Sequence, residues 1–246
     1  MITIIAEKPS VAQQIAHFLS CNIKEDGFFK NSTYYVTWSY GHLLELQTFE
    51  ELGYTGQWSL DSLPFIPNDY TVKLKDDPGI KKHYKIIKEL FLSSSEIICA
   101  TDAGREGELI FRYIYNYSNS NKPVKRLWLN SLTKEAMDKA FKNLKSSDEY
   151  DNLYYSAISR NQADFLVGLN ATMALSAKNN VGLLSLGRVQ TPTLALVCSR
   201  YLENKNFITE PYYGISSILY KDKEFKAFSI DKWKEKSEGE EIFNKI

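Results

Sequence analysis

The chain has 246 residues and a formal net charge of zero, because 30 lysines and arginines balance 30 aspartates and glutamates. Its 13% aromatic and 24% charged residues argue against disorder, and no apolar run approaches the roughly 18 residues of a membrane span. The three cysteines are odd in number and far apart, so neither a disulfide framework nor a zinc site is indicated. No secretory leader is visible, and we therefore expect a cytoplasmic protein without a membrane segment.

Strand-like and helix-like segments alternate over roughly the first 145 residues, which is typical of an α/β layer fold. The predicted strands cover 2–6, 34–39, 96–100 and 124–129, and the predicted helices cover 10–20, 79–92, 106–118 and 133–145. Glycine and proline are frequent between residues 47 and 79, so we expect an irregular excursion from the sheet there.

Beyond residue 148 the apolar pattern becomes helical, over 150–178 and again over 189–204. Two strand-like runs at 212–220 and 224–230 then predict a hairpin. The last segment, 231–246, is charged and shows no closing element. We therefore expect the chain to be the N-terminal part of a longer protein.

Acidic residues follow two of the predicted strands at the point where each strand ends. Glu7 and Lys8 come directly after the first strand, and Asp102 and Glu106 follow the third. Because the carboxyl ends of parallel strands meet at one edge of a sheet, we expect the three acids to converge there. Carboxylate oxygens suit Mg²⁺, and Lys8 suits a phosphate. The alternative interpretation is that these acids cap the helices that follow them.

The residues around the acidic turn have secondary roles in this interpretation. Gly104 and Gly107 are expected to give the turn a positive φ and a close approach to a ligand. Glu108 is expected to point away from the other acids and to be peripheral, and Arg105 either contacts a ligand or balances charge. His42 is isolated from other candidate ligands in the sequence, so a structural role is favoured over a catalytic one.

Four further motifs accompany the Asp102-Ala-Gly-Arg-Glu106 turn. They are Trp38-Ser-Tyr-Gly-His42-Leu, Arg126-Leu-Trp-Leu-Asn-Ser-Leu-Thr133, Arg160-Asn-Gln-Ala-Asp164-Phe-Leu-Val-Gly168-Leu-Asn170-Ala-Thr172 and Ser185-Leu-Gly-Arg188-Val-Gln190-Thr-Pro192. The first part of the chain resembles the Toprim module, and the five motifs, in their order over about 200 residues, resemble type IA DNA topoisomerases of the topoisomerase III kind.

The resemblance implies a fold and a domain order. It implies an α/β Toprim domain over 1–148, with a Rossmann-like parallel sheet flanked by helices. A partial, mainly helical DNA-binding domain over 149–207 and the start of a β-rich gate or hinge domain over 208–246 would follow.

The resemblance also implies residue roles. Glu7 and Lys8 would be catalytic, and Glu7, Asp102 and Glu106 would hold Mg²⁺. Single-stranded DNA would contact Lys8, Arg160, Asp164, Arg188 and Gln190. Two positions depart from the family pattern: Gly104 stands where an aspartate is frequent, which predicts weaker metal binding or one metal ion rather than two, and Met173 stands where an arginine is frequent.

For the intact enzyme, the resemblance implies Mg²⁺-dependent cleavage of one DNA strand through a 5′-phosphotyrosine bond, followed by strand passage and religation. None of the sixteen tyrosines stands in the family's nucleophile motif, so the nucleophile is expected after residue 246 and this fragment should not cleave DNA alone. We expect a monomer associated with the nucleoid. The alternatives are another Toprim phosphoryl-transfer enzyme, such as a nuclease or primase, and a noncatalytic DNA-binding Toprim module.

Overall fold

The computed structural model describes residues 1–179 and 182–245, and its centre is a seven-stranded sheet with the order β2-β3-β4-β1-β7-β8-β9. The strands are β1 Ile2–Ala6, β2 Ile23–Glu25, β3 Phe28–Lys30, β4 Tyr34–Trp38, β7 Glu96–Ala100, β8 Val124–Arg126 and β9 Lys145–Ser146. The pairs β4–β1, β1–β7 and β7–β8 are parallel, and the outer pairs are antiparallel. The predicted α/β sheet with a parallel centre is therefore confirmed.

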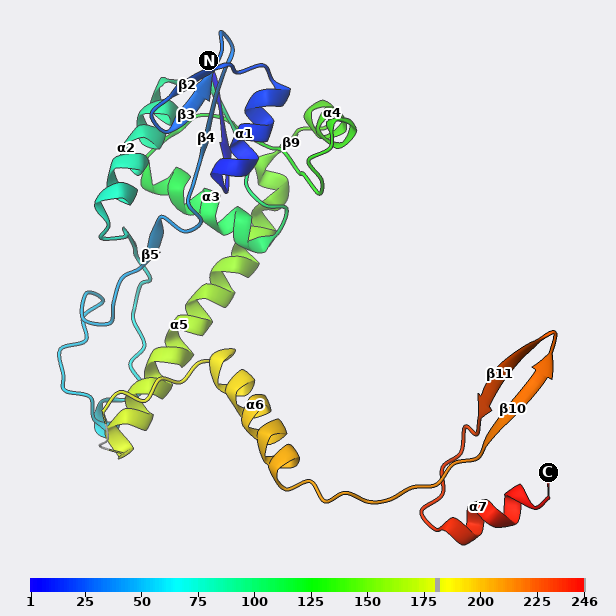
Figure 1. The fold of residues 1–246 in the computed structure, drawn as a ribbon. Helices are drawn as coiled ribbons and strands as arrows, with labels where there is room; N and C mark the ends of the chain where they lie inside the picture. The colour runs from blue at the N-terminus through cyan, green and yellow to red at the C-terminus, as the bar shows by residue number, and fades with distance from the viewer. Residues whose placement is uncertain (180–181, 246) are drawn as a thin grey trace. The chain divides into compact units, whose positions relative to one another are not determined.

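Helices cover both faces of this sheet (Figure 1). They are α1 Pro9–Phe18, α2 Pro78–Ser93, α3 Arg105–Tyr117 and α4 Lys134–Lys142. Neighbouring strand residues point to opposite faces, so Ile5 packs with α2 and α3 while Ile4 packs with α1 and α4. Both isoleucines are fully buried. A strand that is buried on both faces must be apolar throughout, which explains the continuous apolar run in β1.

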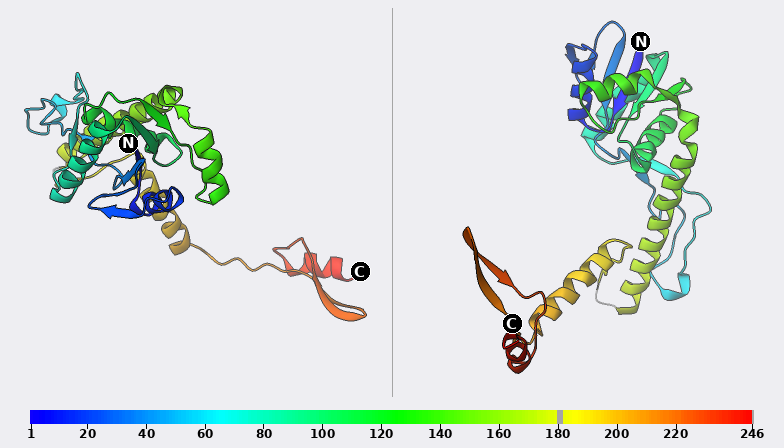
Figure 2. Two further views of the ribbon diagram at one scale, coloured as in Figure 1. Left: turned by 90° about the horizontal axis from the view of Figure 1, so that it is seen from above. Right: turned by 90° about the vertical axis from the view of Figure 1, so that its right-hand side faces the viewer.

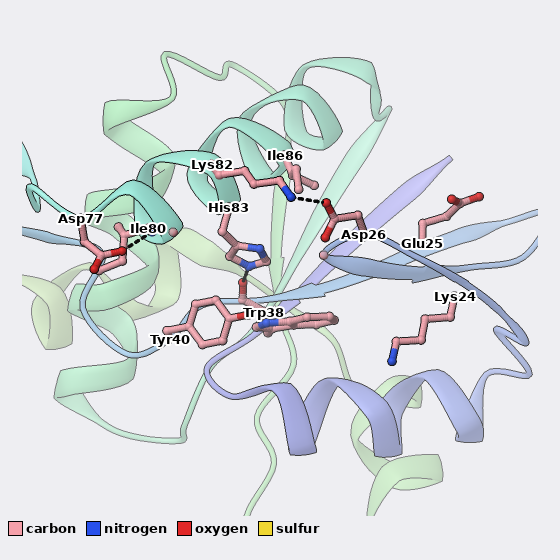
Figure 3. A pocket seen from close by; sticks show the side chains of 12 residues that line it. Lys24, Glu25, Asp26, Trp38, Tyr40, Asp77, Ile80, Lys82, His83 and Ile86 are labelled. Atoms are coloured by element: carbon pink, nitrogen blue, oxygen red, sulfur yellow. Dashed lines mark hydrogen bonds and ion pairs between the residues drawn. The ribbon is translucent and has the colours of Figure 1, made fainter.

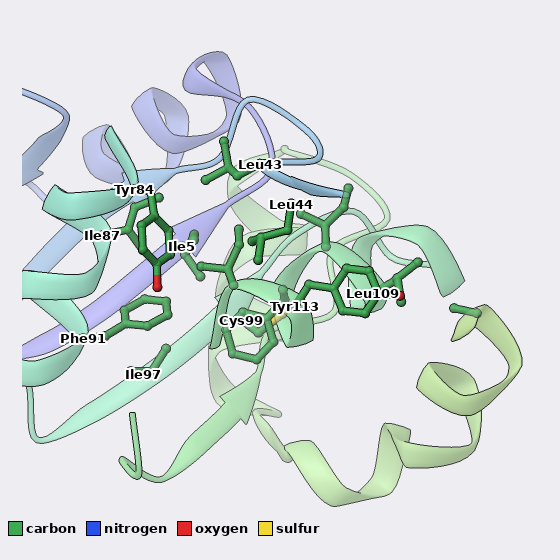
Figure 4. Close-up of a cluster of buried hydrophobic side chains, with 14 residues drawn as sticks. Ile5, Leu43, Leu44, Tyr84, Ile87, Phe91, Ile97, Cys99, Leu109 and Tyr113 are labelled. Atoms are coloured by element: carbon green, nitrogen blue, oxygen red, sulfur yellow. The ribbon is translucent and has the colours of Figure 1, made fainter. Parts of the chain in front are cut away.

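The core under α2 and α3 is built from branched aliphatic and aromatic side chains (Figure 4). Phe91 of α2 and Phe111 of α3 are fully buried, with ring centroids 6.4 Å apart. Leu43, in the segment after β4, and Leu44, the first residue of the strand β5 Leu44–Leu46, extend the cluster. Burial of each such side chain contributes about 1.5–3 kcal/mol relative to exposure. This packing holds the sheet edge from which the acidic residues project.

A long helix, α5 Asp151–Asn179, is fixed at its start to α3. The guanidinium of Arg112 donates to the Asp151 carboxylate at 2.7 Å and to the Ser147 carbonyl at 2.7 Å. Ala157 of α5 is buried in the core beneath α3. The part of α5 nearest the sheet is therefore held by both an ion pair and apolar contact.

The excursion between residues 47 and 79 packs on the same helix. It holds the short helix η1 Leu60–Ser62 and the strand β6 Val72–Leu74, which pairs with β5 Leu44–Leu46. The Asn170 side chain of α5 bonds both backbone polar groups of Phe65 at 2.8 and 2.9 Å. Met173 is 1% exposed in the same aromatic cluster, so a methionine at this position fills a core rather than a surface.

Two compact units can be distinguished, Met1–Arg188 and Val189–Ile246. The second contains α6 Gln190–Lys205, the hairpin β10 Ser216–Lys221 and β11 Lys223–Phe228, and α7 Lys236–Phe243. The predicted helix and hairpin are present. The proposed domain limits at 148 and 207 remain a prediction.

The expectation that residues 231–246 lack a closing element is wrong, because α7 lies near the open end of the hairpin (Figure 2). Trp233 pairs with Tyr213 through the backbone, and a Cβ at Gly239 of α7 would lie 3.4 Å from the Trp233 ring. Close packing of a helical glycine on an indole ring orders this charged segment. In the described part of the chain, no helix has the length and apolar character required to cross a bilayer.

Candidate functional site

Glu7 and Asp102 lie side by side at the carboxyl edge of the sheet. Ala6 of β1 pairs in register with Ala100 of β7, so the residues that follow the two strands emerge together. The Asp102 amide donates to the Glu7 carboxylate at 3.2 Å. Burial raises the pKa of Glu7, and the negative charge of Asp102 raises this pKa further. Two carboxylates are thus held close enough for their charges to interact.

Two cationic or polar side chains lie against the acids. Lys8 Nζ is 3.1 Å from Asp102 Oδ2, and this bond raises the pKa of Lys8. His42 Nε2 is 2.5 Å from Glu106 Oε1. The expectation that His42 is isolated is wrong, because β4 lies beside β1 and the loop after β4 therefore reaches the same edge. Gly41, with φ of 71°, directs the chain there.

In the described residues, no group of three or more His, Cys, Asp or Glu side chains has an arrangement that would hold a metal ion. The donor chemistry nevertheless fits a hard divalent cation, because three carboxylates project from one edge and Mg²⁺ takes few protein oxygens beside its waters. The Asp102 and Glu106 side chains are 51% and 61% exposed, so both can turn away from Lys8 and His42. A metal ion would replace these partners at the carboxylates.

The acidic turn depends on a glycine, but not for the expected reason. Gly104 has an extended φ of 177°, and neither Gly104 nor Gly107 lies in the left-handed region of positive φ that favours glycine, so that prediction is wrong. Gly107 is required by close approach, since a Cβ there would lie 2.2 Å from the Asp102 carbonyl oxygen. Thr101 Oγ1 adds a 2.7 Å bond to the Gly107 carbonyl. A Cβ at position 104 would meet no atom within 4 Å.

Beneath this turn lies Arg126, to which the sequence interpretation gave no role. Its side chain is 1% exposed, and it donates to the carbonyls of Thr101 and Asp102 at 2.8 Å each. Its Nε binds Glu108 at 3.0 Å, and the other Glu108 oxygen accepts from Arg112 at 3.0 Å. Glu108 thus faces away from the other acids, as expected, but it is fully buried and central to the fold. In the sequence, the signal for this role was the presence of a charged residue, Arg126, within the predicted strand 124–129; in the structure this residue ends β8.

On α5, Asp164 lies between two arginines. Arg188 Nη2 binds Asp164 Oδ2 at 3.0 Å, and its Nε binds the other carboxylate oxygen. Arg160 lies one helical turn before Asp164, and its Nε is 3.7 Å from Asp164 Oδ2, as the spacing of the two residues predicted. The bond from Arg188 lowers the pKa of Asp164. Gln190 is exposed and begins α6.

A cavity of about 400 Å³ extends between these two groups, because its lining includes both His42 and Asp164. Tyr113 and Asn161 line it as well, and Tyr113 Oη is 3.4 Å from Asn161 Oδ1. Burial raises the pKa of Tyr113 to about 12, which disfavours the phenolate needed for nucleophilic attack. The acidic edge and the α5 ion cluster therefore border one space.

A second cavity, of about 630 Å³, lies next to α2 (Figure 3). His83 packs against both Trp38 and Tyr40, with ring centroids 5.4 and 4.9 Å away, and its Nε2 is 2.6 Å from the Trp38 carbonyl. Burial lowers the pKa of His83. Acidic and basic side chains are mixed around it, including the ion pair between Lys82 and Asp26 at 2.7 Å. Positive charge does not predominate in this lining, so the lining does not favour DNA.

Family models match both parts of the chain. One described as the Toprim domain matches residues 3–132, and one described as DNA topoisomerase matches residues 148–246. The chain belongs to the type IA DNA topoisomerases. Topoisomerase membership favours the main interpretation over the nuclease, primase and noncatalytic alternatives, because the second match covers the region beyond the Toprim domain.

The relatives of this topoisomerase chain are themselves named as DNA topoisomerases. A putative DNA topoisomerase 3 from Staphylococcus aureus strain RF122 is 43% identical over 99% of this chain, and DNA topoisomerase 3 from strain MRSA252 is also 43% identical. The chain spans 34% of the length of each. The structure of full-length topoisomerase I from Thermotoga maritima matches with a TM-score of 0.61 and 23% identity, over 99% of this chain and 37% of that one. This likeness supports the fold.

Proposed function

We propose that this chain provides the divalent-cation site and part of the single-strand-binding surface of a DNA topoisomerase. The whole enzyme would cut one DNA strand through a 5′-phosphotyrosine bond, pass another strand and reseal the break. The observation that carries this proposal is the cavity of about 400 Å³ whose lining joins His42, beside the acids, to Asp164 on α5. A strand held along α5 could reach the acidic edge through this space.

The acidic edge would position the phosphate that reacts. Toprim domains bind a divalent metal, and we propose Mg²⁺ held by Glu7, Asp102 and Glu106. When bound, the cation would offset charge on the phosphate oxygens. Lys8 would move from Asp102 to a phosphate oxygen, where a point charge stabilises the developing negative charge. Glu7 and Lys8 would be the catalytic residues of this chain.

The DNA-facing side of the first unit would be formed by Arg160, Asp164 and Arg188, together with Lys8, and Gln190 at the start of the second unit would make its own contact with the strand. In the present arrangement, Asp164 neutralises Arg188 and lies near Arg160. A phosphate would compete with Asp164 for these guanidinium groups, because the N–H fork of arginine can donate two parallel hydrogen bonds to a phosphate as well as to a carboxylate. Asp164 would therefore hold the arginines ready for the strand. We further propose that the enzyme acts as a monomer in the cytoplasm, at the nucleoid.

The metal site is tested by Mg²⁺ titration of the 246-residue chain, followed by calorimetry and by the thermal midpoint. We expect Asp102→Asn to abolish the heat of binding and Gly104→Asp to increase affinity, because position 104 has open space and an extended backbone. Asp138→Asn is the control, since Asp138 is an exposed acid on α4. Equal Mg²⁺ binding by Asp102→Asn and Asp138→Asn would contradict the metal site.

The DNA face is tested by titrating a labelled oligothymidylate at several salt concentrations. Arg188→Ala should weaken binding and reduce the slope of log affinity against log salt by about 0.7, the value for one phosphate contact on a single strand. Lys85→Ala removes one exposed positive charge from α2 and should leave the slope unchanged. Equal slopes for both variants would remove Arg188 from the contact surface. Metal-dependent nicking that Glu7→Gln abolishes would instead favour a nuclease.

A further inference from the structure

A third cavity, of about 570 Å³, is lined by residues of the segment after β8, of α4 and of β9. Because β8 is parallel to β7, the residues that follow β8 leave the sheet at the edge that carries Asp102. The cavity is lined by Trp128, Asn130, Ser131, Ala136, Lys139, Ala140, Asn143, Lys145 and Tyr150. Nothing in the proposed function uses these residues.

Aromatic rings form one wall of this cavity. The Trp128 and Tyr150 rings are stacked, with centroids 5.2 Å apart and planes at 17°. On Trp128 also lies the Arg126 guanidinium, with Cζ 5.1 Å from the ring centroid. The same guanidinium donates to the Asp102 carbonyl at 2.8 Å. A single side chain therefore separates the acidic turn from the aromatic wall.

The remaining lining is basic and amide-bearing. Among the described residues that line the cavity, none is acidic, and Lys139 and Lys145 are both exposed. Lys145 pairs with Glu149 at 3.0 Å, whereas the Lys139 ammonium has no ion pair within the described residues. Asn143 uses its Nδ2 on the Lys139 carbonyl at 2.7 Å, which leaves its Oδ1 available to a ligand. This lining differs from the mixed charges of the cavity in Figure 3.

A flat apolar wall beside positive charge is the combination that binds single-stranded nucleic acid without sequence preference. Bases stack on aromatic rings, while cationic side chains follow the phosphates. We propose that this cavity binds one nucleotide of the DNA strand that flanks the acidic turn, with its base against Tyr150 and its phosphate near Lys139. This inference rests on the proposed function, since it assumes a strand at Asp102.

The stacking is tested in the 246-residue chain with labelled oligothymidylate. Tyr150→Leu should weaken binding by roughly 5- to 150-fold, whereas Tyr150→Phe, which keeps the ring, should bind like the unmodified chain. Tryptophan emission should be quenched by the oligonucleotide, and Trp128→Phe should remove part of that quenching. Equal affinity of Tyr150→Leu and Tyr150→Phe overturns the inference.

The charge is tested with surface variants that need not disturb the core. Lys139→Glu should lower affinity and the salt slope, while Lys142→Glu, on the same helix but outside the cavity lining, should have a smaller effect. Equal effects of the two variants overturn the inference, and so does binding of thymidine monophosphate as tight as that of the oligonucleotide.

The outcomes separate this inference from the proposed function. If Arg188→Ala weakens DNA binding but the Tyr150 and Lys139 variants do not, the cavity has no role and the proposed function stands. If the unmodified chain binds no single strand, this inference and the proposed strand-binding surface both fail. The proposed metal site is tested separately, by Mg²⁺ binding that depends on Asp102.

Discussion

Replacing Glu108 by glutamine should destabilise the first unit by about 3 kcal/mol. Glu108 is fully buried and accepts from Arg126 and Arg112 at 3.0 Å each. Glutamine can still accept from one arginine, but its amide group then faces the other, so one charged hydrogen bond of about 1.5–3 kcal/mol is lost. Breaking a buried ion pair from one side costs about 3–5 kcal/mol. In the variant, Arg126 still donates to the backbone carbonyls of Thr101 and Asp102. The expected loss is therefore at the lower end of the range of about 3–5 kcal/mol.

Urea unfolding measures this loss, with tryptophan fluorescence in a Trp233→Phe background so that the signal comes from the first unit. For a slope of about 2–3 kcal/mol per molar, the midpoint should fall by about 1 M. Glu106→Gln is the matched control, because Glu106 lies on the same helix and its side chain is 61% exposed. It should shift the midpoint little and act instead on Mg²⁺ binding. Equal midpoints for both variants would refute the argument that the buried acid stabilises the sheet edge.

Three further outcomes follow from the same edge and from α5. Gly107→Ala should destabilise the first unit by more than 1 kcal/mol, whereas Gly104→Ala should be tolerated, as thermal midpoints would measure. Burial and a neighbouring charge raise the pKa of Glu7, so the ionised acid opposes folding; without divalent ions, Glu7→Gln should raise the thermal midpoint at pH 7, with the gain disappearing in acid. Arg188 lowers the pKa of Asp164, so that contribution to stability is present at neutral pH and is lost as the pH falls through the lowered pKa; carboxyl NMR should detect a higher pKa for Asp164 in Arg188→Ala.

The central strands and their helices were predictable because each carries a strong local signal. The apolar run of β1 and the helical periodicity of α3 both arise from burial against a sheet, and the structure places them within one or two residues of the prediction. The short strands β2 and β3 were missed, since three exposed or half-buried residues carry no clear alternation. β3 forms by pairing with β4, and β2 forms by pairing with β3, so both strands depend on their neighbours in the sheet rather than on a pattern of their own.

The site was predictable in part for the same reason. Glu7 and Asp102 could be brought together from the sequence, because parallel strands deliver their following residues to one edge. His42 and Arg126 could not be assigned, since their roles depend on the strand order β4-β1-β7-β8, which periodicity does not determine. Likewise, the sequence indicated that a glycine is needed at position 107. The reason is the close approach of the Asp102 backbone rather than the torsion angle of Gly107.

The layering of the acidic edge has a consequence for how this family can vary. The guanidinium of Arg126 secures the backbone from below, whereas Asp102 and Glu106 project from above and contribute little to that anchorage. Acids could therefore be gained or lost on the upper surface while the scaffold persists, and position 104, where a Cβ would meet no atom within 4 Å, has room for one. Related proteins could in this way differ in their affinity for metal ions while the fold of the domain stays the same.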